Sequence, residues 1–102
     1  MSTTLLLKRD GETIAIATPH WADSLALALR YGWNPLGPTA AYLASGFKVS
    51  LADASALAAA FDRIFESALQ DPMRFHPVRV DLSELSLVND FVREGAFEVW
   101  DA

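Results

Sequence analysis

A short stretch of the sequence, RYGWNPLGPT at residues 30–39, has the spacing of a phosphate-binding loop. Gly32 and Gly37 fit the glycines of G-x-x-x-x-G-K-[ST], and Thr39 fits the final hydroxyl. Pro38 occupies the lysine position. Such a loop follows a strand and holds phosphates with lysine and free backbone N–H groups. Here a helix precedes the loop and two prolines remove donors, so we interpret the stretch as the end of a helix.

The two histidines, His20 and His76, titrate closest to neutral pH and are candidates for acid–base or metal chemistry. Neither has further ligands at the helical or hairpin spacing that a metal or catalytic centre needs. The chain contains no cysteine, which excludes a disulfide, a thiolate ligand and a Cys nucleophile. No Ser-His-Asp order or G-x-S-x-G elbow occurs. We therefore expect no metal, no cofactor and no catalytic residue.

Four carboxylates form a candidate partner face. They lie one turn apart in pairs on two predicted helices: Asp62 and Glu66, and Asp90 and Glu94. Like charges at this spacing repel slightly, so a basic partner would relieve them, although pairing of Arg63 with Glu66 would make an ordinary solvated face. The net charge of −5 comes from the half after residue 50. This acidic field repels phosphate backbones, so we expect no nucleic-acid binding.

Residues 3–18, TTLLLKRDGETIAIAT, predict a β-hairpin. Asp10-Gly11 suits the two positive φ angles of a type I′ turn, and apolar runs flank it on both sides. A two-residue turn sets Arg9 opposite Glu12, and the register then follows along both strands. Because side chains alternate across a strand, one face collects the apolar residues that should meet the core, namely Leu5, Leu7, Ile14 and Ile16.

Helix-start and helix-end residues divide the middle of the chain. Thr18 as cap and Pro19 as first helical residue predict the start of a first helix, and Gly32 predicts its left-handed end. Two further helices, over residues 51–69 and 82–94, are predicted from apolar stripes and from two helix caps, Ser50 with Asp53 and Asp81 with Glu84.

The remaining segments complete a small sheet. Residues 39–50, TAAYLASGFKVS, have the pattern of a short second hairpin or an irregular ribbon. Residues 96–100, AFEVW, alternate like a strand that could join the N-terminal hairpin. The sequence therefore predicts an α+β fold, with three helices packed on a small antiparallel sheet, and we take residues 1–102 as a single domain.

The other face of the predicted sheet also carries apolar side chains. Leu6 and Ala15 from the hairpin and Trp100 from the last strand would form a candidate interface patch there. Such a patch marks an interface with a second copy or another protein. The alternative is that the chain's own loop 70–80 folds over it.

A second candidate site is a pocket in which Trp33, Tyr42 and His76 converge. The aromatic residues flank irregular segments, where ligand sites often lie. No window approaches the roughly 18 unbroken apolar residues of a membrane-spanning helix, and the N-terminus has the reverse order of a secretory signal. The sequence thus predicts no membrane association and a cytoplasmic location.

Three ordered stretches, YGWNPLGPT, GFKVSLADASALAAAF and FVREGAFEVW, resemble a group of small bacterial proteins of unknown function. The patterns that we associate with this group are G-W-x-P-x-G-T, G-x-x-V-x-x-x-D-A-x-x-L-A and a final F-x-x-x-G-G-F. This chain departs from them by inserting Pro38 before Thr39 and by having Ala96 in place of the second glycine. The resemblance implies a bacterial, cytoplasmic protein and brings no activity with it.

These features favour binding over catalysis. We predict a non-catalytic protein-interaction module, of an immunity-like or regulatory-partner kind, whose acidic helical face meets a basic partner. The alternatives are a small-molecule-binding domain and a structural homodimer joined through the outer sheet face.

Overall fold

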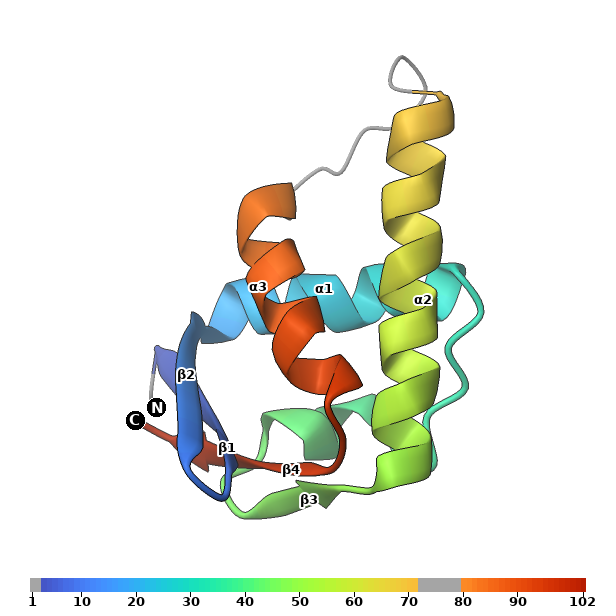
Figure 1. Ribbon diagram of the computed structural model, residues 1–102. Coiled ribbons are helices and arrows are strands. Elements are labelled where there is room, and N and C mark those ends of the chain that lie inside the picture. Colours follow the sequence, from blue (N-terminus) through green and yellow to red (C-terminus); the bar gives the residue numbers. More distant parts are fainter. Residues whose placement is uncertain (1–2, 72–79) are drawn as a thin grey trace.

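The structure is a computed structural model that describes residues 3–71 and 80–102. One antiparallel sheet has the strand order β2-β1-β4-β3, and the helices lie on one side of it (Figure 1). This confirms the predicted α+β fold, with an N-terminal hairpin plus a C-terminal strand. The elements in chain order are β1 (Thr4–Arg9), β2 (Glu12–Ala17), α1 (Thr18–Arg30), the 3₁₀ helix η1 (Thr39–Leu43), β3 (Phe47–Val49), α2 (Leu51–Gln70), α3 (Leu82–Arg93) and β4 (Phe97–Asp101).

The hairpin of β1 and β2 has the predicted register, from Arg9 opposite Glu12 to the far end of both strands. The predicted turn type is wrong. Gly11 has a φ of 77°, but Asp10 does not have a positive φ. These signs belong to a type II turn, in which only the second central residue is left-handed. The register is unchanged because both turn types have two central residues between the strands.

The first helix differs from the prediction at its start and agrees with it at its end. Thr18 is already helical, and Ala17 takes the cap position, where no side-chain cap hydrogen bond forms. The Thr18 N–H donates to the carbonyl of Thr3 at 2.9 Å, so the chain enters the helix directly from the hairpin ladder. At the other end Gly32 has a φ of 96°, and the N–H of Trp33 donates back to the Ala28 carbonyl at 3.0 Å. The predicted left-handed helix end is confirmed.

The segment before α2 does not form a second hairpin of its own. Its first part is η1, and its second part, β3, adds an edge strand to the sheet beside β4, with Val49 opposite Phe97. α2 then begins where the sequence predicts, because the Ser50 hydroxyl accepts the Asp53 N–H at 3.2 Å. Within the described residues, no helix is long and apolar enough to cross a membrane.

A buried carboxylate, Asp53, ties the irregular segment between α1 and β3 to α2. Its oxygens accept hydrogen bonds from Trp33 Nε1, at 3.0 Å, and from the Tyr42 hydroxyl. Trp21 of α1 in turn donates its Nε1 to the Tyr42 carbonyl at 2.9 Å. All four side chains are at most 4% exposed. Because a buried carboxylate without partners costs several kcal/mol, these bonds fix the segment in one position.

The same burial, together with the hydrogen bond to the Asp53 carboxylate and its charge, raises the pKa of Tyr42 from 10.0 to about 12. A raised pKa means that folding favours the neutral hydroxyl over the phenolate. The contribution of Tyr42 to stability is therefore complete below pH 10 and is lost as the pH rises from about 10 to about 12.

We expect Tyr42→Phe to flatten this alkaline loss of stability. The free energy of unfolding, measured by urea denaturation from pH 7 to pH 12, should fall less steeply above pH 10 in the variant than in the wild type. At pH 7 the variant should be less stable by about 1–3 kcal/mol, because Asp53 loses one donor. Tyr31→Phe removes the other tyrosine hydroxyl, which donates to Ser67 Oγ at 3.2 Å, and serves as the control. Equal slopes in Tyr42→Phe and the wild type would contradict this role of Tyr42.

Candidate interaction surface

The outer face of the sheet, which points away from the helices, carries an apolar row of three residues. Ala15, Leu6 and Trp100 stand directly opposite one another on β2, β1 and β4. Trp100 is 39% exposed, Ala15 is exposed and Leu6 is half-buried. The structure thus brings the three residues of the predicted patch together, side by side across three strands, with Lys8 Nζ 5.9 Å from the centre of the Trp100 ring. The alternative prediction was that loop 70–80 covers this patch. Residues 72–79 of that loop lie outside the described residues.

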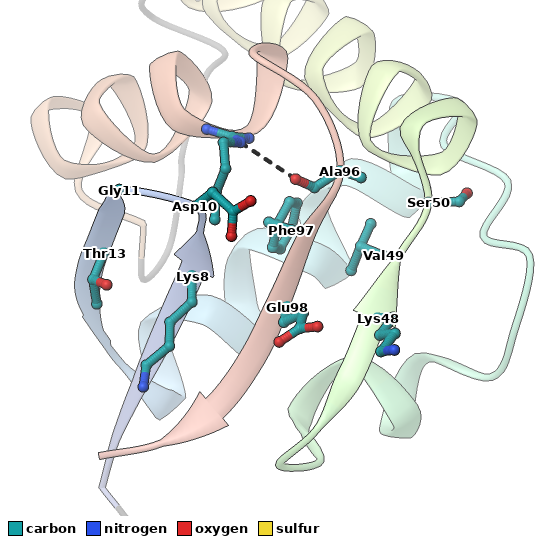
Figure 2. Close-up of a pocket in the computed structure, with 11 residues that line it drawn as sticks. Lys8, Asp10, Gly11, Thr13, Lys48, Val49, Ser50, Ala96, Phe97 and Glu98 are labelled. Atoms are coloured by element: carbon teal, nitrogen blue, oxygen red, sulfur yellow. Dashed lines mark hydrogen bonds between the residues drawn. The ribbon is translucent and has the colours of Figure 1, made fainter.

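A charged row runs beside the apolar row. Thr13, Lys8, Glu98 and Lys48 face one another across the four strands. They line an open depression of about 700 Å³ next to the β1–β2 turn (Figure 2). Glu98 accepts a hydrogen bond from Trp100 Nε1 at 3.0 Å, which joins the two rows. Because Glu98 lies between two lysines, the charged row carries one more positive than negative charge.

Arg9 holds the turn at the rim of this depression. Its guanidinium donates to the carbonyls of Phe91 at 2.6 Å, Gly95 at 2.9 Å and Ala96 at 3.3 Å. The guanidinium also lies 4.2 Å from the centre of the Phe91 ring, and it pairs with Glu94 at 3.3 Å. Carbonyls at the end of a helix lack intrahelical donors and attract cations. One side chain of β1 therefore satisfies the end of α3 and joins it to the hairpin.

Two carboxylates of the predicted partner face, Asp62 and Glu94, form ion pairs with arginines of the same chain. Asp62 Oδ1 accepts from Asn89 Nδ2 at 2.9 Å and from the Arg93 guanidinium at 2.5 Å, which links α2 to α3. Glu94 pairs with Arg9, as described above. A partner that used these two carboxylates would first have to displace bonds that hold the helices together.

The other two carboxylates of that face, Glu66 and Asp90, are exposed. The alternative prediction was an ordinary solvated face in which Arg63 pairs with Glu66. Arg63 instead donates its Nε to the Tyr31 carbonyl at 2.5 Å. It reaches that carbonyl because Gly32 turns the end of α1 towards α2, and its guanidinium packs over Gly32. The four residues of the predicted face therefore differ in what they can offer to a partner.

Two of the three residues of the candidate pocket lie together in the core. The rings of Trp33 and Tyr42 meet edge to face with centroids 5.0 Å apart, and both donate to Asp53. Both are at most 2% exposed, so each fills the space beside the other. His76 lies outside the described residues. The open depression is elsewhere, on the outer face of the sheet.

His20 connects two helices in the described part of the chain. Its Nε2 accepts the N–H of Asp81 at 3.1 Å and lies 3.9 Å from a Glu84 oxygen, so it joins the start of α1 to the start of α3. Across residues 3–71 and 80–102, no group of three histidine, aspartate or glutamate side chains is arranged to hold a metal ion.

Sequence reasoning missed two residues that determine this geometry. It assigned Asp53 to a helix cap and Arg9 to a pair with Glu12, and both contacts exist, at 3.2 Å and 3.4 Å. For Asp53 a further signal was present, because it stands one turn before Leu57 on the apolar stripe of α2 and so points inwards. For Arg9 no local signal exists, because its main acceptors are more than eighty residues away.

Comparisons of the chain with protein-family models, with curated proteins and with solved structures find no match. The resemblance to small bacterial proteins therefore stays a prediction, and function has to be inferred from the geometry of this molecule.

Replacing Arg9 by lysine should loosen the turn from α3. Lysine has no planar fork, so it cannot serve three carbonyls while lying over the Phe91 ring. We expect Arg9→Lys to lower the free energy of unfolding by about 1–3 kcal/mol, measured by urea denaturation at pH 7. Arg30→Lys, an exposed arginine at the end of α1, is the matched control and should change it by less than about 0.5 kcal/mol. If Arg9→Lys and Arg30→Lys lower the free energy of unfolding by the same small amount, Arg9 does not hold the turn.

Proposed function

We propose that the protein is a non-catalytic interaction module that binds a partner protein through the outer face of its sheet. The observation that carries this proposal is the apolar row of Ala15, Leu6 and Trp100 on the outer face, in which Ala15 and Trp100 are exposed and Leu6 is half-buried. An exposed apolar patch bordered by polar side chains is typical of interaction sites. Tryptophan is also among the residues that most often dominate binding energy at such sites.

The charged row defines the chemistry of the partner. Lys8 and Lys48 lie on either side of Glu98, so this face is locally positive although the chain as a whole has a net charge of −5. Opposite charges at the border of an interface steer and orient the encounter. The partner surface should therefore be apolar and bordered by carboxylates.

We prefer this face to the acidic helical face because Asp62 and Glu94 already pair within the chain. A partner that used these two carboxylates would break bonds between secondary-structure elements, whereas the apolar row can be covered without breaking any such bond between elements. An immunity-like or regulatory role and a cytoplasmic location remain part of the proposal.

The test is an affinity pull-down from the native cell with two matched variants. Trp100→Ala combined with Lys8→Glu changes the outer sheet face, and Glu66→Lys combined with Asp90→Lys changes the acidic helical face. We expect a stoichiometric partner that the first variant loses and the second retains. With the purified partner, calorimetry should show at least about tenfold weaker binding for Trp100→Ala alone.

Urea denaturation of each variant shows whether a loss of binding reflects unfolding. Trp100→Ala should stay folded because the side chain is 39% exposed and lies outside the core cluster. Loss of the partner only in the helical variant would move the binding surface to the acidic helices, and recovery of the protein alone in every case would reject a heterologous partner.

A further inference from the structure

The two edges of the sheet differ in how they are protected. β3, at one edge, has only three residues and a lysine at its centre, which are common ways to prevent an edge from pairing. β2, at the other edge, has six residues, ETIAIA, with neither proline nor lysine. It forms the margin of the described molecule, with no helix or strand beyond it (Figure 1). β2 is therefore an unprotected edge.

The register shows which backbone groups of β2 point outwards. Residues of an antiparallel pair alternate between those that exchange hydrogen bonds and those that do not, and the pair next to a two-residue turn exchanges them. In β2 this set is Glu12, Ile14 and Ile16, and it continues to Thr18, whose N–H donates to the Thr3 carbonyl at 2.9 Å. The N–H and C=O groups of Thr13, Ala15 and Ala17 consequently face the open side.

These outward groups are self-complementary. When a second copy runs antiparallel with Ala15 opposite Ala15, the two alanines exchange both of their hydrogen bonds. Each Ala17 N–H then meets the Thr13 carbonyl of the other copy, while the Ala17 carbonyl stays with the first turn of α1. No like charges stand opposite one another in this arrangement.

The side chains fit the same register on both faces of the sheet. On the helix side Ile14, which is only partly buried at the margin of the core, comes opposite the second copy's Ile16. On the outer side only small residues meet. Among registers that place an outward residue opposite its own copy, one centred on Ala17 would bring in Pro19, which has no N–H, and one centred on Thr13 would use the turn instead of the strand. Of these three registers, the one centred on Ala15 pairs the most of β2.

We propose that two copies of this chain pair through β2 around Ala15, so that the four strands of each copy join into one continuous antiparallel sheet. A second copy is the occupant because the edge matches itself in register and in side chains on both faces. The proposal concerns the edge and not the outer face, so it stands or falls separately from the proposed function. The pairing places two outer faces side by side in one surface.

Single cysteines test the pairing directly because the chain has none of its own. In an edge-paired dimer the two Ala15 Cα atoms are about 5.5 Å apart, which lies within the disulfide range. The two Leu6 Cα atoms are three strand spacings apart, or about 14 Å, which is too far. We expect mild oxidation to cross-link Ala15→Cys, seen on a non-reducing gel and by mass, and to leave Leu6→Cys monomeric. Cross-linking of Leu6→Cys as readily as Ala15→Cys would show packing face to face and overturn the proposal.

Light scattering on the unmodified chain provides a measurement that needs no disulfide. The wild type should approach twice its mass of 11.1 kDa as its concentration rises. Ala15→Pro should stay at 11.1 kDa, because proline removes the central outward N–H and no hydrogen bond of the hairpin. Ala15→Ser keeps this N–H and should dimerise like the wild type. A wild type that stays monomeric at millimolar concentration would reject pairing of two copies through β2, and a strand of another protein would then be the candidate to pair with this edge. A proline variant that still dimerises would also reject pairing through β2.

Discussion

The position of the segment between α1 and β3 depends on one buried carboxylate. Asp53 accepts hydrogen bonds from the two aromatic residues of the irregular segment that leads from α1 to β3. This segment contains only one short 3₁₀ helix, so it has little regular backbone bonding of its own. The carboxylate replaces that bonding and holds the segment against the first turn of α2. The chain therefore arrives at β3 in the right place to pair with β4, although no regular element guides it there.

Among residues 3–71 and 80–102, the helices pack on one face of the resulting sheet. Leu5, Leu7 and Val99 meet the helices and are at most 1% exposed, whereas the alternate residues of the same strands face outwards. One-sided packing requires an outer face that water tolerates, and the lysines and glutamate of the charged row meet this requirement. Leu6 and Trp100 do not meet it. This contrast between the two rows is the basis of the function proposed for the outer face.

Features with local causes could be predicted from the sequence. The hairpin register follows from a two-residue turn, and the alternation of side chains along each strand then places Leu6 and Ala15 on the same face. Features that depend on distant residues could not be predicted. Trp33 and Tyr42 suggested a pocket because nothing local shows that Asp53 lies between them. Asp62 appeared free to meet a partner because Arg93, which pairs with it, comes from another helix.

The central place of β4 has a consequence for how the protein forms in the cell. The two middle strands of the sheet come from residues 4–9 and 97–101, so their pairing closes almost the whole described chain into a loop. During synthesis the hairpin and the helices emerge first, but β1 and β3 each lack a neighbour until β4 leaves the ribosome. The nascent chain thus carries two open strand edges and an incomplete core, the kind of surface that chaperones recognise. We therefore expect folding to finish late, because β1 and β4 can pair only after a long loop has closed.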